Sequence, residues 1–141
     1  MAIAICFKNN PMQYIPQAPP FVMIDDLLRA DDAGAETSFH IKSGHLFVEN
    51  DVFTESGLIE NMAQTAAAGT GKLAADNGEA PPVGFIGAIK GLQIYSLPKV
   101  GSTINTQVSY VTKIMNASIV TATVTCDGQK LAEAEFKIFL Q

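Results

Sequence analysis

The residue in this sequence best suited to acid–base chemistry is Glu60, a carboxylate within an otherwise apolar helical pattern. Leucine, isoleucine, methionine and alanine recur over residues 58–67 at the 3.6-residue period of a helix. Burial among such residues penalises the charged form of a carboxylate, and a carboxyl group in that setting suits a general acid or base. The alternative is that Glu60 lies on the solvent edge of the helix beside Asn61.

The helix that would carry Glu60 is the one long helix that the pattern predicts, over residues 53–72. Thr54 or Ser56 can cap its first turn through a side-chain oxygen, and Glu55 is favoured there by the helix dipole. After Met62 the apolar face narrows to alanine and glycine, which lets a neighbouring sheet approach closely. We therefore expect a helix embedded in a sheet, with little of its surface facing solvent.

The composition is typical of a globular chain and disfavours several classes of function. The 141 residues are 48% hydrophobic and 16% charged, which predicts a single domain over residues 1–141. A net charge of −5 without a basic run disfavours nucleic-acid binding. Cys6 and Cys126 have no metal-binding spacing and fit a reducing compartment. The apolar start over residues 2–7 is too short for a signal or a membrane span, so we expect a cytoplasmic protein. We also expect that it uses no cofactor.

Around the helix the pattern predicts strands joined by short turns. Residues 1–10 form a lead-in, either an edge strand or a brief helix, and residues 11–20 form a proline-rich turn region that cannot propagate a helix. Residues 44–54 form a loop that turns at Asn50-Asp51, and Asp127-Gly128 is a tight-hairpin signal. Such an order favours an antiparallel sheet that curls around the helix, the α+β hot-dog fold. The expected strands are Phe21–Leu28, Ala35–Lys42, Val83–Ile94, Gly101–Lys113, Ala117–Cys126 and Lys130–Leu140.

Five segments, taken in order, match the motifs of one family. Tyr14-Ile-Pro-Gln-Ala-Pro-Pro-Phe-Val-Met-Ile-Asp25 is similar to an opening Leu-Pro-His-x-x-Pro-Phe-x-x-x-Asp motif, and Glu60-Asn-Met-Ala-Gln64 to a helix motif Glu-x-x-Ala-Gln. Gly84–Lys90 is similar to the strand after the helix, Leu97–Gly101 to a Pro-x-x-Pro-Gly turn, and Asp127–Ala134 to a closing hairpin. Together they resemble the hot-dog 3-hydroxyacyl-ACP dehydratases of fatty-acid biosynthesis and their relatives in polyene pathways.

The resemblance implies a homodimer or higher homo-oligomer, with the acyl chain in a tunnel at the subunit interface. The substrate would be an acyl carrier protein thioester or an acyl-CoA. A histidine takes the C2 proton of the 3-hydroxyacyl group, and the helix carboxylic acid protonates the departing C3 hydroxyl. Backbone N–H groups at the helix start polarise the thioester carbonyl, where the helix dipole is positive. Carried over, the catalytic pair is Glu60 and His45. The substrate-binding residues are Gln64, Gly57, Gly84, Phe85 and Gly87.

The loop before the helix departs from the family pattern, because it is several residues shorter than the loop that holds the family's histidine. An alignment on Leu46-Phe47 brings Asn50 or Asp51 near the histidine position. An alignment on Gly44-His45 keeps a Gly-His pair but inserts one residue before the helix. Glu55 stands where the family helix opens with glycine. Shorter loops of this kind occur in divergent polyene-pathway dehydratases.

Two histidines are available as the base. His40 lies within an alternating strand, and we interpret it as a structural residue. His45 is the histidine placed to meet Glu60 across a dimer interface, and the alternative is a loop histidine with no role. Gln17 replaces the histidine of the opening motif. Gln64 either bonds the Glu60 carboxyl group, holds the loop, or packs between helix and sheet.

Three functions remain open at this stage. A dehydratase needs both the carboxylic acid and a base, whereas a thioesterase on the same scaffold needs only a carboxylate to activate water. A non-catalytic acyl-binding subunit follows if the short loop has removed the base. Because carrier proteins are acidic, Lys90, Lys99 and Lys113 are candidates for the carrier-binding face.

Overall fold

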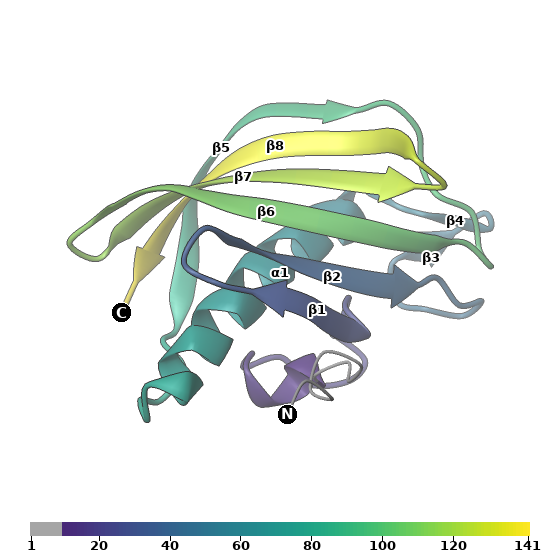
Figure 1. Cartoon of the computed structure of the whole chain (residues 1–141). Helices are drawn as coiled ribbons and strands as arrows, with labels where there is room; N and C mark the ends of the chain where they lie inside the picture. Colours follow the sequence, from purple (N-terminus) through teal and green to yellow (C-terminus); the bar gives the residue numbers. More distant parts are fainter. Residues whose placement is uncertain (1–9) are drawn as a thin grey trace.

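The computed structural model describes residues 10–141, and in it a single long helix lies beneath a curled sheet (Figure 1). Cys6 and the predicted lead-in, except Asn10, lie outside the described residues. A 3-10 turn occupies Pro11–Gln13 within the proline-rich segment. The further elements are β1 (Asp26–Ala30), β2 (Gly34–His40), β3 (Val48–Glu49), β4 (Val52–Phe53), α1 (Glu55–Asp76), β5 (Gly84–Ile94), β6 (Thr103–Ile114), β7 (Ala117–Cys126) and β8 (Gln129–Leu140).

The main sheet has six strands in the order β1-β2-β6-β7-β8-β5, and every neighbouring pair is antiparallel. Its concave side wraps α1 (Figure 1), and the alternating residues of β7 that face the helix are buried. Asp127 and Gly128 both have positive φ, as a two-residue hairpin turn requires. The α+β hot-dog fold expected from the sequence is confirmed.

Helix α1 begins at a Thr54 cap, whose Oγ1 accepts a hydrogen bond from the Gly57 N–H at 3.3 Å. The small residues of its later turns allow close packing. A Cβ at Gly71 would lie 2.2 Å from the Tyr14 carbonyl oxygen, and one at Gly69 would lie 2.3 Å from the Tyr110 hydroxyl. The alanine and glycine face therefore serves close approach of neighbouring segments, as expected.

Asn61 is a polar residue on the side of α1 that faces the sheet, and it is fully buried. Its Nδ2 donates to the Met23 carbonyl at 2.7 Å, and its Oδ1 accepts from the Thr106 hydroxyl at 2.5 Å. Thr65 donates to the Asn61 carbonyl at 2.8 Å. Asn61 thus faces the sheet and the N-terminal segment, whereas the neighbouring Glu60 is only half-buried.

Two expectations for the flanking segments are corrected. The strand expected over Phe21–Leu28 was wrong in its first half, because β1 starts only at Asp26. The backbone groups of Phe21 and Met23 bond to side chains of α1 instead of to a strand. The region expected as a loop over residues 44–54 contains the short β3–β4 hairpin, with its turn at Asn50-Asp51 as predicted and positive φ at both residues.

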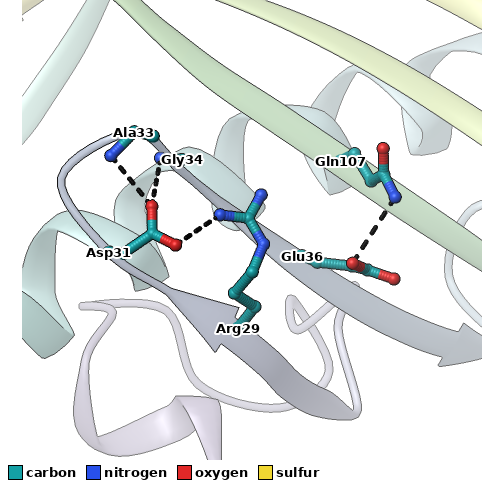
Figure 2. A network of polar contacts seen from close by, with 6 residues as sticks. All are labelled: Arg29, Asp31, Ala33, Gly34, Glu36 and Gln107. Carbon is teal, nitrogen blue, oxygen red and sulfur yellow. Dashed lines mark hydrogen bonds and ion pairs between the residues drawn. The ribbon is translucent and has the colours of Figure 1, made fainter.

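The turn between β1 and β2 is closed by Asp31 on the outer surface (Figure 2). Its Oδ1 accepts from the backbone N–H groups of Ala33 and Gly34 at 2.8 and 2.9 Å, and its Oδ2 pairs with Arg29 at 2.7 Å. The Arg29 hydrogen bond, followed by those from the backbone, holds the pKa of Asp31 below its ordinary value. This charge cluster stabilises the turn and lies away from Glu60.

Candidate active site

A cavity of about 340 Å³ lies between α1 and the strands β5 to β8, and Glu60 lines it. On the helix the cavity follows one stripe from Glu60 to Thr70, a span of about 15 Å at 1.5 Å per residue. Alanines form the floor between these two residues, and Ile86, Val120 and Ile138 contribute to the walls. This apolar trough suits a hydrocarbon chain that extends from the carboxyl group of Glu60.

Gln64 fixes the orientation of the half-buried Glu60. Its Nε2 donates to Glu60 Oε1 at 3.1 Å and to the Phe21 carbonyl at 2.7 Å, while its own Oε1 accepts from the Met23 N–H at 2.8 Å. Gln64 is 1% exposed, and these contacts use both of its N–H groups. Of the roles considered for Gln64, the bond to the carboxyl group is present, and its other bonds hold the segment at Phe21 and Met23 and not the loop before the helix.

His45 lines a different cavity, of about 330 Å³, within the same chain. Its Nδ1 accepts from the Phe47 N–H at 3.1 Å, so in the neutral ring the proton sits on Nε2, which is 3.4 Å from the Val22 carbonyl. The ring also packs against Phe39 and Phe53, with centroids 5.4 and 5.7 Å away. Inside one subunit His45 is thus engaged and separate from Glu60.

His40 lies at the end of β2, where its Nδ1 is 3.0 Å from the Thr103 hydroxyl. Its backbone N–H donates to Asp25 at 2.7 Å. These contacts fit the structural role that the strand pattern indicated, and His40 does not line the cavity of Glu60.

Of the three β5 residues expected to bind substrate, two line the cavity and one does not. Gly84 and Phe85 line the cavity with Glu60, whereas Gly87 does not. A Cβ at Gly87 would lie 2.3 Å from the Phe139 ring, so this glycine serves strand packing. The structure therefore brings the start of β5, but not its middle, to the candidate site.

Gly57 lies at the helix start and outside the cavity. Its N–H donates to the Thr54 cap, which makes it unavailable as a donor to a thioester carbonyl in this arrangement. A Cβ at this position would lie 2.6 Å from the Phe53 ring and 3.0 Å from Phe47. The observed role of Gly57 is to admit these aromatic rings against the first turn.

Tyr110 and Lys113 line the cavity together, which strand alternation did not predict. The β6–β7 register shifts between Tyr110 and Thr112, and this irregularity turns residues 110 and 113 toward the same side. Tyr110 donates to the Ala66 carbonyl at 2.8 Å, and burial raises the pKa of its hydroxyl. The Lys113 ammonium lies 5.0 Å from the Tyr110 ring centre. Of the three lysines proposed for carrier binding, Lys113 alone lines this cavity.

Gln17 is a further cavity residue whose role the sequence did not indicate. The one available signal was its position in the opening motif, where the family has histidine.

Within residues 10–141 no group of three histidine, cysteine or carboxylate side chains could hold a metal ion. No helix in this part of the chain is long and apolar enough to cross a membrane.

Comparison with protein families matches residues 9–141 to the ApeP-like model, described as ApeP dehydratase. The chain belongs to the ApeP-like dehydratase family. The dehydratase function expected from the sequence is thereby confirmed at the level of the family. A search of curated protein sequences found no match.

Solved structures show the same fold as this ApeP-like chain. The dehydratase heterocomplex ApeI:P from Xenorhabdus doucetiae has a chain with 17% identity and a TM-score of 0.88, covering 96% of this chain and 93% of that one. A hypothetical thioesterase with coenzyme A from Streptococcus pneumoniae TIGR4 has 10% identity and a TM-score of 0.68, covering 82% and 84%. The smu.793 protein from Streptococcus mutans UA159, bound to acetyl-CoA, has 13% identity and a TM-score of 0.69, covering 91% and 96%.

Proposed function

We propose that Glu60 is the general acid with which this ApeP-like chain dehydrates 3-hydroxyacyl thioesters of a polyene-type pathway. The supporting observation is a carboxyl group at the edge of an apolar trough, with one oxygen held by Gln64. No hydrogen bond within residues 10–141 engages Oε2 of Glu60, so this oxygen is the one that can carry the proton. Glu60 protonates the C3 hydroxyl, which leaves as water, while a base removes the C2 proton and the C2=C3 double bond forms.

The base comes from a second hot-dog subunit in this proposal. The cavity of Glu60 contains no histidine of its own chain, and both ring nitrogens of His45 have partners. A second copy can supply His45 as the base in one of two ways: Nδ1 gives up the Phe47 N–H, or the ring proton moves to Nδ1 and Nε2 leaves the Val22 carbonyl. A different subunit can supply its own base, and the ApeI:P dehydratase is a heterocomplex.

Strand β5 is the surface on which we expect this subunit to dock. It stands at the edge of the sheet and pairs, among the described strands, only with β8. Its apolar side chains are open to solvent, with Phe85 54% and Ile89 38% exposed. An edge strand with unpaired backbone groups and apolar side chains is a template for another strand. A subunit paired there would lie beside the start of β5, where Gly84 and Phe85 line the cavity.

Mass spectrometry of a 3-hydroxyacyl carrier thioester tests the reaction. We expect the acyl group to lose the mass of one water while it stays on the carrier, and Glu60→Gln to slow this by about 10²–10⁴-fold. Asp76→Asn, an exposed acid at the other end of the same helix, is the matched control and should leave the rate unchanged. A Glu60→Gln variant with full activity would exclude the proposed acid.

The same assay distinguishes dehydration from thioesterase activity, for which a carboxylate without a histidine in its cavity is sufficient. Release of the free acid would identify that activity. An unchanged substrate, with the chain in its assembled form, would identify a non-catalytic subunit. Native mass measurement of the chain alone and after co-purification tells a homo-oligomer from a complex with a different subunit. His45→Gln should then slow dehydration only if a second copy supplies the base.

A further inference from the structure

Gln17 carries a polar atom that the folded chain does not satisfy. Its Oε1 is closed off from solvent and is the one buried side-chain nitrogen or oxygen within residues 10–141 that has no hydrogen-bond partner. The side chain lines the same cavity as Glu60. Its backbone is constrained by Pro16 on one side and by the Pro19-Pro20 pair on the other, which holds the amide near this cavity.

An unpaired buried carbonyl oxygen destabilises the folded chain, whereas an apolar side chain of the same shape would avoid this loss. Packing alone therefore does not account for an amide at this position. A donor supplied by a ligand does account for it. Because the last torsion of a glutamine is broad, a small rotation can turn Oε1 toward the cavity.

We propose that Gln17 accepts the hydrogen bond of the substrate's C3 hydroxyl and so binds the group that leaves. The proposal rests on the dehydration proposed above. A hydroxyl has one donor and two acceptor sites. Glu60 donates its proton to the oxygen, and the hydroxyl's own hydrogen then needs an acceptor. Gln17 forms no covalent bond and transfers no proton, and its oxygen holds the hydroxyl until it departs as water.

Two other polar side chains near this cavity, Gln64 and Tyr110, are already engaged. Gln64 uses its oxygen on Met23 and both N–H groups on other partners. The Tyr110 hydroxyl donates to a helix carbonyl and receives a bond from Thr70 at 3.4 Å, about 15 Å along the helix from Glu60. Among the cavity-lining side chains within residues 10–141, Gln17 is the one with a buried acceptor that has no partner, and a hydroxyl bound in the cavity of Glu60 is a donor that can satisfy it.

The test compares the binding of two thioesters of equal chain length, one with the C3 hydroxyl and one without it. Glu60→Gln serves as the background because it retains a donor but lacks the transferable proton, so that binding is read without turnover. In this background Gln17→Leu should weaken binding of the hydroxylated ligand roughly three- to tenfold and leave the saturated ligand unchanged. Gln13→Leu, an exposed glutamine of the same segment, should change neither.

Stability provides the second measurement. Because leucine removes an unpaired polar atom, the urea midpoint of Gln17→Leu should stay the same or rise. A lower midpoint together with equal weakening of both ligands would show that Gln17 only maintains the shape of the cavity. Unchanged binding of both ligands would also overturn the proposal. A wild-type chain that distinguishes the two ligands but does not dehydrate would refute the proposed function and leave the hydroxyl site standing.

Discussion

Replacing Gln64 with leucine should detach the N-terminal segment from α1 and release the carboxyl group of Glu60 at the same time. Leucine is close to glutamine in volume, so the change removes hydrogen bonds and leaves little empty space. The backbone N–H of the fully buried Met23 would lose its acceptor, and the Phe21 carbonyl its donor. Glu60 would lose the bond that orients it.

The cost follows from the surroundings of these two backbone groups. The Met23 N–H has no water to replace Gln64, so its loss amounts to about 1–3 kcal/mol. Phe21 is 55% exposed, which allows water to reach its carbonyl, so that bond contributes about 0.5–1.5 kcal/mol. We expect the free energy of unfolding to fall by about 1.5–4.5 kcal/mol in total. The dehydration rate should fall roughly 10- to 100-fold, since a displaced carboxyl group reacts poorly.

Urea unfolding of the assembled protein, combined with the carrier-thioester assay, measures both effects. Gln107→Leu is the control, because this exposed glutamine donates to Glu36 at 3.4 Å on the outer face of the sheet (Figure 2). It should change the free energy of unfolding by less than about 0.5 kcal/mol. If Gln64→Leu remains within about 1 kcal/mol of the wild type, the side chain does not hold the segment and the reasoning fails.

Three further outcomes follow from the packing and the charges. Gly69→Ala should lower the free energy of unfolding by about 1–3 kcal/mol, because its Cβ would lie 2.3 Å from the Tyr110 hydroxyl and 2.6 Å from the Ala35 Cβ; an unchanged urea midpoint would contradict this. Since the Arg29 contact lowers the folded pKa of Asp31, its stabilisation is present above the ordinary value of about 3.9 and is lost as the pH falls through the folded pKa. The urea midpoints of wild type and Asp31→Asn should therefore converge on acidification, and a constant difference would refute it. Burial raises the folded pKa of Tyr110. The contribution of the protonated hydroxyl to stability is therefore fully present below a pH of about 10 and is lost as the pH rises through the folded pKa. Because desolvation and the Glu133 bond also raise the pKa of Tyr95, the measurement uses a Tyr95→Phe background. In it, absorbance at alkaline pH should show a late tyrosinate step that Tyr110→Phe removes, and persistence of that step would contradict the burial argument.

The fold was predictable because its main signals are local. The helical period around Leu58 and Met62, the alternation of Ala117–Cys126 and the Asp127-Gly128 turn each act over a few residues. The strand expected at Phe21 failed for the opposite reason. Its apolar composition fits a strand, but side chains of α1 more than 35 residues away bind its backbone.

The candidate site was predictable only in part, because its geometry depends on contacts between distant segments. Glu60 stood out as a carboxylate in an apolar pattern, and Gln64 one turn later followed from the resemblance. For Gln17 the resemblance indicated only a position in the opening motif, since an unpaired amide oxygen is a property of the folded chain. Lys113 reaches the cavity through an irregularity in β6 that the alternation of residues does not reveal.

The open edge of β5 also bears on how much of this protein a cell can maintain. A newly synthesised copy without a second subunit exposes an unpaired edge strand, with which an exposed strand of another chain can pair. If a different subunit covers this edge, as proposed, matched synthesis of the two chains should influence the amount of folded protein as strongly as their affinity does. Chaperones and proteases would remove surplus copies, so the exposed strand makes the amount of this protein depend on the amount of its second subunit.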